Sequence, residues 1–337
     1  MHYSDYLELD KILDAQHLES DRQGQPAHDE MLFIVIHQAY ELWFRQLLYE
    51  TDSVIGILEQ PALNDNSPEL QIIVHRLSRC ATILKVLVHQ IDIMETMTPM
   101  DFLDFRDKLR PASGFQSWQF KLLEARLGLK YEHRFGQQYY ISQLRQPEID
   151  RIKTAEIGPS LLQLLNSWLE RMPFFDEPAA DAFWTDYRLR YQQSLADAEK
   201  GNNAYFDSIF SHTAAEAGTA TGKPTRSLSP AACRSALFIM LYRGYPLLQL
   251  PFQVLNQLLE IDEQLSTWRY RHMSMVHRMI GSRIGTGGST GKDYLGSALE
   301  RHHIFREIAA LTSFLIERKR LPALNPEMER RLGFVAP

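Results

Sequence analysis

The sequence predicts an all-α fold, a single helical domain built from long buried helices. Two segments in which apolar residues recur with a helical period carry this prediction, at residues 29–58 and 68–94. A third observation is that no run of alternating apolar and polar residues is bounded by hairpin turns. We expect one exception, a short extended piece within 131–141.

The segment at 68–94 predicts an amphipathic helix. Pro68 and Glu69 suit its first turn, where a missing N–H costs little and negative charge meets the helix dipole. Pro99 follows its end. Its apolar residues recur at steps of three and four, namely at Leu70, Ile73, Val74, Leu77, Ala81, Leu84, Val88, Ile91 and Met94.

The segment at 29–58 carries large apolar residues on most faces, which predicts a helix that is buried on several sides. We expect a surface loop at about 200–229, where Gly, Ser, Thr and Ala are frequent, within a single domain of residues 1–337. Further helices are expected near 116–127, 158–171, 180–199, 230–242, 247–260, 262–282 and 292–317.

Composition excludes several classes of protein. The 337 residues include only two cysteines, which excludes a disulfide scaffold and a four-cysteine zinc site. The net charge of −6 provides no general attraction to nucleic acid, and no apolar run approaches the roughly 20 residues of a membrane span. We therefore expect a cytoplasmic protein that binds neither nucleic acid nor membranes. Any metal ligands should be imidazoles or carboxylates, because the chain has 12 histidines and thiols are nearly absent.

The glycine-rich segment 285–292 does not match the phosphate-binding template, because position 286 is Thr and Lys292 is followed by Asp293. Two interpretations remain open for it. It is either a flexible connection between helices, or a loop whose backbone and hydroxyl groups approach a ligand closely.

Three polar residues lie beside apolar or aromatic neighbours at helical spacing. His272 follows Trp268 by four residues, and His37 follows Phe33 by four. Each imidazole is either a core histidine bonded to a backbone carbonyl or a ligand of a bound group. Arg106 is either half of a helix-end salt bridge or a guanidinium held ready for a carboxylate.

Four blocks of sequence, in the same order, resemble the tryptophan 2,3-dioxygenase family. They are YSDYLELD at 3–10, HDEMLFIVIHQAYELWF at 28–44, DFLDFRDKLRPASGFQS at 101–117 and WRYRHMSMVHRMIGSRIGTGGS at 268–289. The likeness extends from residue 3 to about 325 and is weakest at 200–229. No single short motif decides it, but four separate blocks in one order are not expected by chance.

The resemblance implies an all-helical protomer that binds haem b and assembles as a homotetramer. The implied reaction inserts both atoms of O2 across the indole C2–C3 bond of L-tryptophan. The product is N-formyl-L-kynurenine, and the reaction is the first step of tryptophan degradation by the kynurenine pathway. Tyr3 and Tyr6 would reach the pocket of a neighbouring subunit, so assembly and catalysis would be linked.

The resemblance also implies roles for residues around the haem. His272 corresponds to the proximal ligand of the iron, and His37 to the distal histidine near the indole nitrogen. Ser113 and Gly114 would lie on the distal side of the haem.

For the substrate, Arg106 corresponds to the residue that binds the carboxylate, and Thr286 to the loop threonine near the ammonium group. Phe33 and Phe102 would line the indole pocket. These residue types suit a zwitterionic amino acid with a large apolar side chain, because a guanidinium pairs with a carboxylate and a hydroxyl oxygen accepts from an ammonium group.

Three alternatives are weighed against this interpretation. A related haem oxygenase could act on another indole, although Arg106 and Thr286 favour a substrate with an amino-acid group. A non-catalytic haem sensor or carrier would need neither Arg106 nor His37. A helical scaffold without a cofactor would show no Soret band after haem is supplied.

Overall fold

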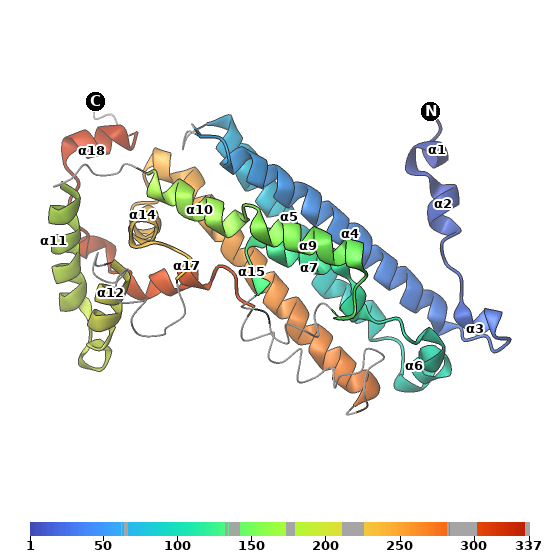
Figure 1. The fold of residues 1–337 in the computed structure, drawn as a ribbon. Coiled ribbons are helices and arrows are strands. Elements are labelled where there is room, and N and C mark those ends of the chain that lie inside the picture. The colour runs from blue at the N-terminus through green and yellow to red at the C-terminus, as the bar shows by residue number, and fades with distance from the viewer. Residues whose placement is uncertain are drawn as a thin grey trace. The chain divides into compact units, whose positions relative to one another are not determined.

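The computed structural model describes residues 1–61, 63, 67–131, 134, 142–172, 179–210, 226–281, 283 and 302–333. Within these ranges the chain forms helices and no strand, which confirms the predicted all-α class (Figure 1). The two long helices predicted first are present with the predicted bounds, as α4 (Asp29–Leu58) and α5 (Pro68–Met94).

The remaining helices are shorter, with the exception of α15. In chain order the α-helices are α1 (Tyr3–Leu7), α2 (Leu9–Leu13), α3 (Glu19–Arg22), α6 (Pro99–Arg106), α7 (Trp118–Leu127), α9 (Gln146–Ile157), α10 (Leu161–Glu170), α11 (Ala179–Ser194), α12 (Asn202–Phe210), α14 (Pro230–Leu241), α15 (Pro246–Ile280), α17 (Arg306–Ala310) and α18 (Pro326–Arg331). Short 3-10 helices are η1 (Asp107–Leu109), η2 (Gly114–Gln116), η4 (Asp197–Glu199), η5 (Leu311–Phe314) and η6 (Arg318–Arg320).

The chain divides into two compact units, each assembled from separated segments. The first unit comprises Met1–Tyr49, Ala81–Ile157 and Glu263–His303. The second comprises Glu50–Cys80, Gly158–Asp262 and Ile304–Pro337. The organisation of residues 1–337 as a single domain therefore stays a prediction.

Most of the shorter predicted helices are present. Those expected near 116–127, 158–171, 180–199 and 230–242 are α7, α10, α11 and α14, and 3-10 helix η4 follows α11. Helix α9 was not predicted, and α12 occupies the beginning of the loop expected at about 200–229. Residues 211–225 of that loop, and most of the expected extended piece at 131–141, lie outside the described residues.

The two helices predicted at 247–260 and 262–282 are one continuous helix, α15, so the predicted break is wrong. Neither glycine nor proline interrupts the chain at this point. Asp262 is a weak helix former, but it is buried, and its carboxylate accepts hydrogen bonds from the backbone N–H groups of Ile304 (3.0 Å) and Phe305 (3.1 Å). The Asp262 carboxylate is thus bonded to a distant segment and does not compete for the backbone groups of its own helix, which would favour a helix end.

The same contact corrects the helix predicted at 292–317. The N–H groups of Ile304 and Phe305 are bonded to Asp262, and no helix includes these two residues. Helix α17 begins only at Arg306 and passes after five residues into the 3-10 helix η5. Residues 292–301 lie outside the described part of the chain.

The second unit has an aromatic core. Phe206 stacks on Tyr191 with ring centroids 5.1 Å apart, and Phe314 meets Phe206 edge-on at 5.5 Å. The buried hydroxyl of Tyr187 donates to the Phe314 carbonyl at 2.5 Å, so its polar end is satisfied. Among the described residues of both units, no helix combines the length and the apolar character that a bilayer crossing requires.

Candidate functional site

The first unit encloses a cavity of about 310 Å³. Its walls come from α4, α5, α6, η2, α7 and α15, so segments far apart in the sequence form one site. Seven of the residues singled out in the sequence line it: Phe33, His37, Phe102, Arg106, Ser113, Gly114 and His272. A cavity of this size is in the range of small-molecule sites.

His37 lies on α4 and is held by its own helix. Its Nδ1 is 2.7 Å from the carbonyl oxygen of Phe33, one turn earlier. Because a carbonyl only accepts, Nδ1 carries the proton and Nε2 keeps its lone pair. Burial lowers the pKa of His37, and the Phe33 hydrogen bond and the Glu41 carboxylate offset this only in part. The ring is therefore a neutral hydrogen-bond acceptor at the cavity.

His272 lies on α15 and stacks on Trp268 of the same helix, with centroids 5.1 Å apart and ring planes 5° apart. Burial, and then the neighbouring His37, lower the pKa of His272 to about 4. Its Nδ1 is buried and has no hydrogen-bond partner among the described residues. A neutral imidazole with an unsatisfied nitrogen is suited to a metal or another polar group.

Aromatic rings form an apolar wall between α4 and α6. Phe33 stacks on Phe102 at 5.7 Å, and Phe105 meets both rings edge-on at 5.6 and 5.4 Å. Phe105 is fully buried, whereas Phe33 and Phe102 are half-buried because they face the cavity. The wall can therefore hold a flat apolar group.

Arg106 ends α6, and a capping box determines where this helix begins. The N–H of Thr98 donates to the Asp101 carboxylate at 2.8 Å, and the N–H of Asp101 donates to Thr98 Oγ1 at 3.3 Å. The helix places Phe102 and Arg106 one turn apart on the same cavity. Arg106 is only 5% exposed, so an anion that enters the cavity would meet a desolvated guanidinium.

Ser113 and Gly114 form the start of η2. Ser113 caps it, accepting from the N–H of Phe115 at 3.4 Å while its own N–H donates to Gln116 at 3.2 Å. A Cβ added at Gly114 would meet no atom within 4 Å. The chain thus leaves open space beside a residue that lines the cavity.

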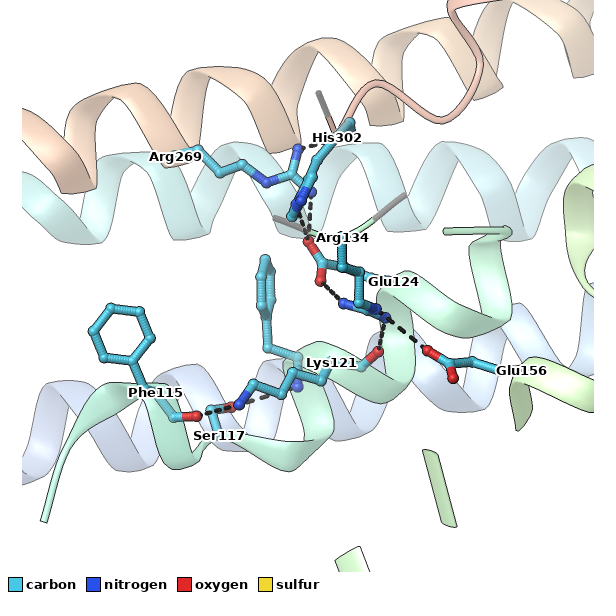
Figure 2. A network of polar contacts seen from close by, with 9 residues as sticks. Phe115, Ser117, Lys121, Glu124, Arg134, Glu156, Arg269 and His302 are labelled. Carbon is cyan, nitrogen blue, oxygen red and sulfur yellow. Dashed lines mark hydrogen bonds and ion pairs between the residues drawn. The ribbon is translucent and has the colours of Figure 1, made fainter. Parts of the chain in front are cut away.

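A buried polar network forms another part of the cavity wall (Figure 2). At its centre is Glu124 on α7, which accepts from Arg134 Nη1 at 2.6 Å and from Arg269 Nη2 at 2.7 Å. His302 Nδ1 lies 3.5 Å from the same carboxylate. Burial alone would raise the pKa of Glu124, but Arg134, the His302 hydrogen bond and Arg269 outweigh it and hold the pKa well below its usual range.

None of the residues of this network is among those predicted from the sequence to form the site. Its local signal is weak, since Glu124 and Lys121 are charged residues three apart on a helix that is otherwise largely apolar. What makes them functional candidates is their pairing with residues up to 145 positions away, which spacing does not reveal.

Lys121 is a further buried cation at the cavity, and its ammonium donates to the Phe115 carbonyl. Burial and then Arg134 lower its pKa from 10.5 to about 8, against the opposing effect of Glu124 and Glu148. Between these two pH values the unfolded chain binds more protons than the folded protein. The stability that depends on this group is therefore complete above pH 10.5 and is lost as the pH falls towards about 8.

We expect the free energy of unfolding of the wild type, relative to Lys121→Met, to rise by about 3 kcal/mol over this window. Urea unfolding of the ligand-free protein near pH 8 and near pH 10.5 measures it. The same substitution at exposed Lys130 controls for the loss of a charge. A constant difference between wild type and Lys121→Met across the window would contradict the expectation.

Two residues singled out in the sequence do not line this cavity, and a third lies outside the described residues. Tyr3 and Tyr6 lie on α1, are each 70% exposed and do not line it. Their predicted contact with a neighbouring subunit stays a prediction. Thr286 lies outside the described residues, as does the whole glycine-rich segment 285–292.

Comparison with known proteins points to one family. The profile of the family described as tryptophan 2,3-dioxygenase matches residues 1–315. A tryptophan 2,3-dioxygenase of Alteromonas mediterranea is 44% identical over 99% of this chain and 97% of its own length. Proteins with the same name from Bdellovibrio bacteriovorus and Dictyostelium discoideum are 41% and 40% identical over 99% of this chain, and over 98% and 88% of their own lengths.

Proposed function

Because the chain belongs to the tryptophan 2,3-dioxygenase family, we propose that it inserts both atoms of O2 across the indole C2–C3 bond of L-tryptophan. The product is N-formyl-L-kynurenine, and the reaction opens tryptophan degradation by the kynurenine pathway. The observation that best supports this proposal is the cavity of the first unit, where two neutral imidazoles, an aromatic wall and a buried guanidinium meet.

The residues of the cavity fit a haem. The buried Nδ1 of His272 has no hydrogen-bond partner among the described residues, so the imidazole is not committed to another role. One imidazole, that of His272, would be sufficient for the protein to hold the iron of a haem. The space beside Gly114 is open to a flat group. When bound, the haem iron would supply the binding and activation of O2, the chemistry that side chains lack.

The protein's own residues bind and orient the substrate. Arg106 pairs with the carboxylate, and because the guanidinium is buried this pair is strong and directional. Phe33 and Phe102 bury the indole ring and keep water from it. The resemblance assigns the ammonium group to Thr286. These contacts favour an amino acid over a simple indole, which distinguishes the proposal from an oxygenase of another indole.

His37 orients the indole by accepting its N–H at Nε2. The Nδ1–H bond to the Phe33 carbonyl keeps this tautomer in place. We regard His37 as an orienting group and not a base, because an indole N–H is a poor acid and addition to the ring does not require its removal.

For His37→Ala we expect turnover of L-tryptophan to persist, with kcat/KM lowered about 2- to 10-fold. This factor corresponds to the net free energy of one hydrogen bond, the one between the indole N–H and the imidazole. N-methylation of the indole should cost the wild type a similar factor and cost the variant little, because the bond is already absent. Steady-state kinetics with both substrates measures this cycle. Total loss of activity on L-tryptophan in His37→Ala would contradict the orienting role.

The experiment that tests the function combines a spectrum with product analysis. The protein is supplied with haem, reduced, and recorded with and without L-tryptophan and O2, and the product is identified by mass. We expect a Soret band, a spectral response to L-tryptophan and formation of N-formyl-L-kynurenine. A spectral response without product would favour a haem sensor, and turnover of indole or tryptamine in preference to L-tryptophan would favour an oxygenase of another indole.

We also propose that the chain assembles as a homotetramer. Exposed apolar residues recur at steps of seven on α4 at Val35, Leu42 and Tyr49, which are 46%, 60% and 71% exposed. Val86 and Ile93 repeat this step on α5. A step of seven returns to one face of a helix, and such a face is typical of helix association between chains.

Leu42→Glu is therefore expected to convert the tetramer to smaller species, because a carboxylate would be buried in each contact. Size-exclusion chromatography with light scattering measures the mass in solution. Leu189→Glu on α11, where the leucine is also half exposed, is the matched control. An unchanged tetramer in Leu42→Glu would remove this face from the interface.

A cytoplasmic location is consistent with the thiols. Both cysteines, Cys80 and Cys233, are buried and unpaired, and burial raises the pKa of each to about 12. Unreactive free thiols are typical of a reducing compartment.

A further inference from the structure

We propose that Glu124 is a positioning residue for His272, acting through Arg269. The inference rests on the proposed function, in which His272 holds the haem iron, and adds a residue that determines how its ring is presented. Glu124, Arg269 and His272 all line the cavity of the first unit.

No hydrogen bond from a described residue to Nδ1 orients the His272 ring. This nitrogen is buried, and the ring stacks on Trp268. Trp268 and His272 lie on the same helix, so the stack turns with the helix, and Trp268 packs in turn on Phe120 of α7 with ring centroids 4.9 Å apart. The direction of the imidazole therefore depends on the rotation of α15 about its axis.

Arg269 is the buried charged contact that holds this rotation beside His272. It precedes His272 by three residues, so the two side chains leave neighbouring parts of the helix surface. Its Nη2 donates to Glu124 Oε1 at 2.7 Å and its Nη1 donates to the His302 carbonyl at 3.2 Å (Figure 2). The planar guanidinium is thus attached to two separate segments, and its side chain is only 3% exposed.

Glu124 is in turn held by Arg134. Its second oxygen accepts from Arg134 Nη1 at 2.6 Å, while Arg134 Nη2 donates to the backbone carbonyl of Lys121 at 2.9 Å. Arg134 Nε also donates to Glu156 Oε1 at 3.3 Å. The Glu124 carboxylate is therefore braced against the backbone of its own helix, α7, and transmits this position to Arg269.

Charge makes this connection stiff. The Glu124 side chain is 5% exposed, and both arginine partners are buried. If the Glu124 carboxylate moved away from the two arginines, buried charges would be left without a partner. Because that is costly, other positions of the carboxylate are strongly disfavoured. A neutral hydrogen bond in the same place would allow more movement.

The test compares Glu124→Gln with Glu50→Gln in the full-length protein. Glu50 is a matched control, because it is a buried carboxylate paired with an arginine, Arg79, at 2.6 Å, and it belongs to the other compact unit. Both variants should be less stable than the wild type. Only Glu124→Gln should shift and broaden the iron–histidine stretching band in the resonance Raman spectrum of the reduced, haem-loaded protein.

A second variant, Arg269→Lys, keeps the charge but cannot bridge Glu124 and the His302 carbonyl together, and should shift the same band. If Glu124→Gln does not fold, the spectrum of Arg269→Lys tests the proposal in its place. A band unchanged from that of the wild type in either folded variant, or shifted equally by Glu50→Gln, would overturn the proposal.

A readout without haem separates this inference from the proposed function. In cofactor-free protein labelled at histidine carbon, the His272 ring resonance should be single and narrow in the wild type and in Glu50→Gln, and broadened or split in Glu124→Gln. An unaltered resonance in Glu124→Gln would overturn the inference. Failure of the wild type to take up haem would overturn the proposed function. The His272 resonance of the cofactor-free variants would still show whether Glu124 positions the His272 ring.

Discussion

Replacing His272 with alanine is expected to abolish stable haem binding. The haem-supplied variant should lack the Soret band of the wild type after removal of free haem, and activity on L-tryptophan should fall to background. Among the residues that line the cavity, His272 combines a lowered pKa with an unpartnered buried nitrogen, so it presents a lone pair at neutral pH without first losing a proton.

The control for this experiment lies on the same helix. His277 is exposed near the end of α15, and His277→Ala should bind haem as the wild type does. Imidazole added to His272→Ala should restore haem binding in part, because it fills the space that the side chain leaves. If His272→Ala takes up haem with the affinity and reduced-state spectrum of the wild type, another residue holds the iron.

Replacing Arg106 with methionine is expected to lower kcat/KM for L-tryptophan by about 30- to 5,000-fold. This range corresponds to about 2–5 kcal/mol, the cost of leaving one partner of a buried charge pair without the other. The effect should be large because Arg106 is only 5% exposed, so water has little access to take the place of the lost contact.

Two comparisons make this result specific to the carboxylate. Binding of tryptamine, which lacks that group, should be changed far less by Arg106→Met than binding of L-tryptophan. Arg110→Met, four residues further along and exposed, should leave both unchanged. An equal loss for the two ligands would indicate that Arg106 supports the cavity wall and not the substrate.

The sequence predicts those elements whose signals are local. Helix α5 begins at Pro68 and ends at Met94 as expected, because a first-turn proline and an uninterrupted stripe of apolar residues mark it. Helix α15 was predicted as two helices, at 247–260 and 262–282, but it is continuous. The carboxylate of Asp262, at the predicted break, accepts hydrogen bonds from the backbone N–H groups of Ile304 and Phe305. This contact joins residues more than 40 positions apart, so the local sequence does not reveal it.

The site divides in the same way. Seven residues identified by their neighbours and by family likeness lie around one cavity, and the roles proposed for them follow from residue type. The state of these groups was not predictable. The tautomer of His37 depends on a bond to the Phe33 carbonyl, and the lowered pKa of His272 depends on burial and on His37, which is 235 positions away in the chain.

The sequence by itself therefore determined the helical class, the extent of the two long helices and the residue types offered to a ligand. These depend on the period of apolar residues and on side-chain chemistry, which are properties of short segments. The tertiary structure alone decided that Glu124 joins Arg134, Arg269 and the segment at His302 into one buried network. The physical reason is that burial and charge pairing depend on which segments meet in the folded chain. The interaction energy of two charges changes severalfold between water and a buried site.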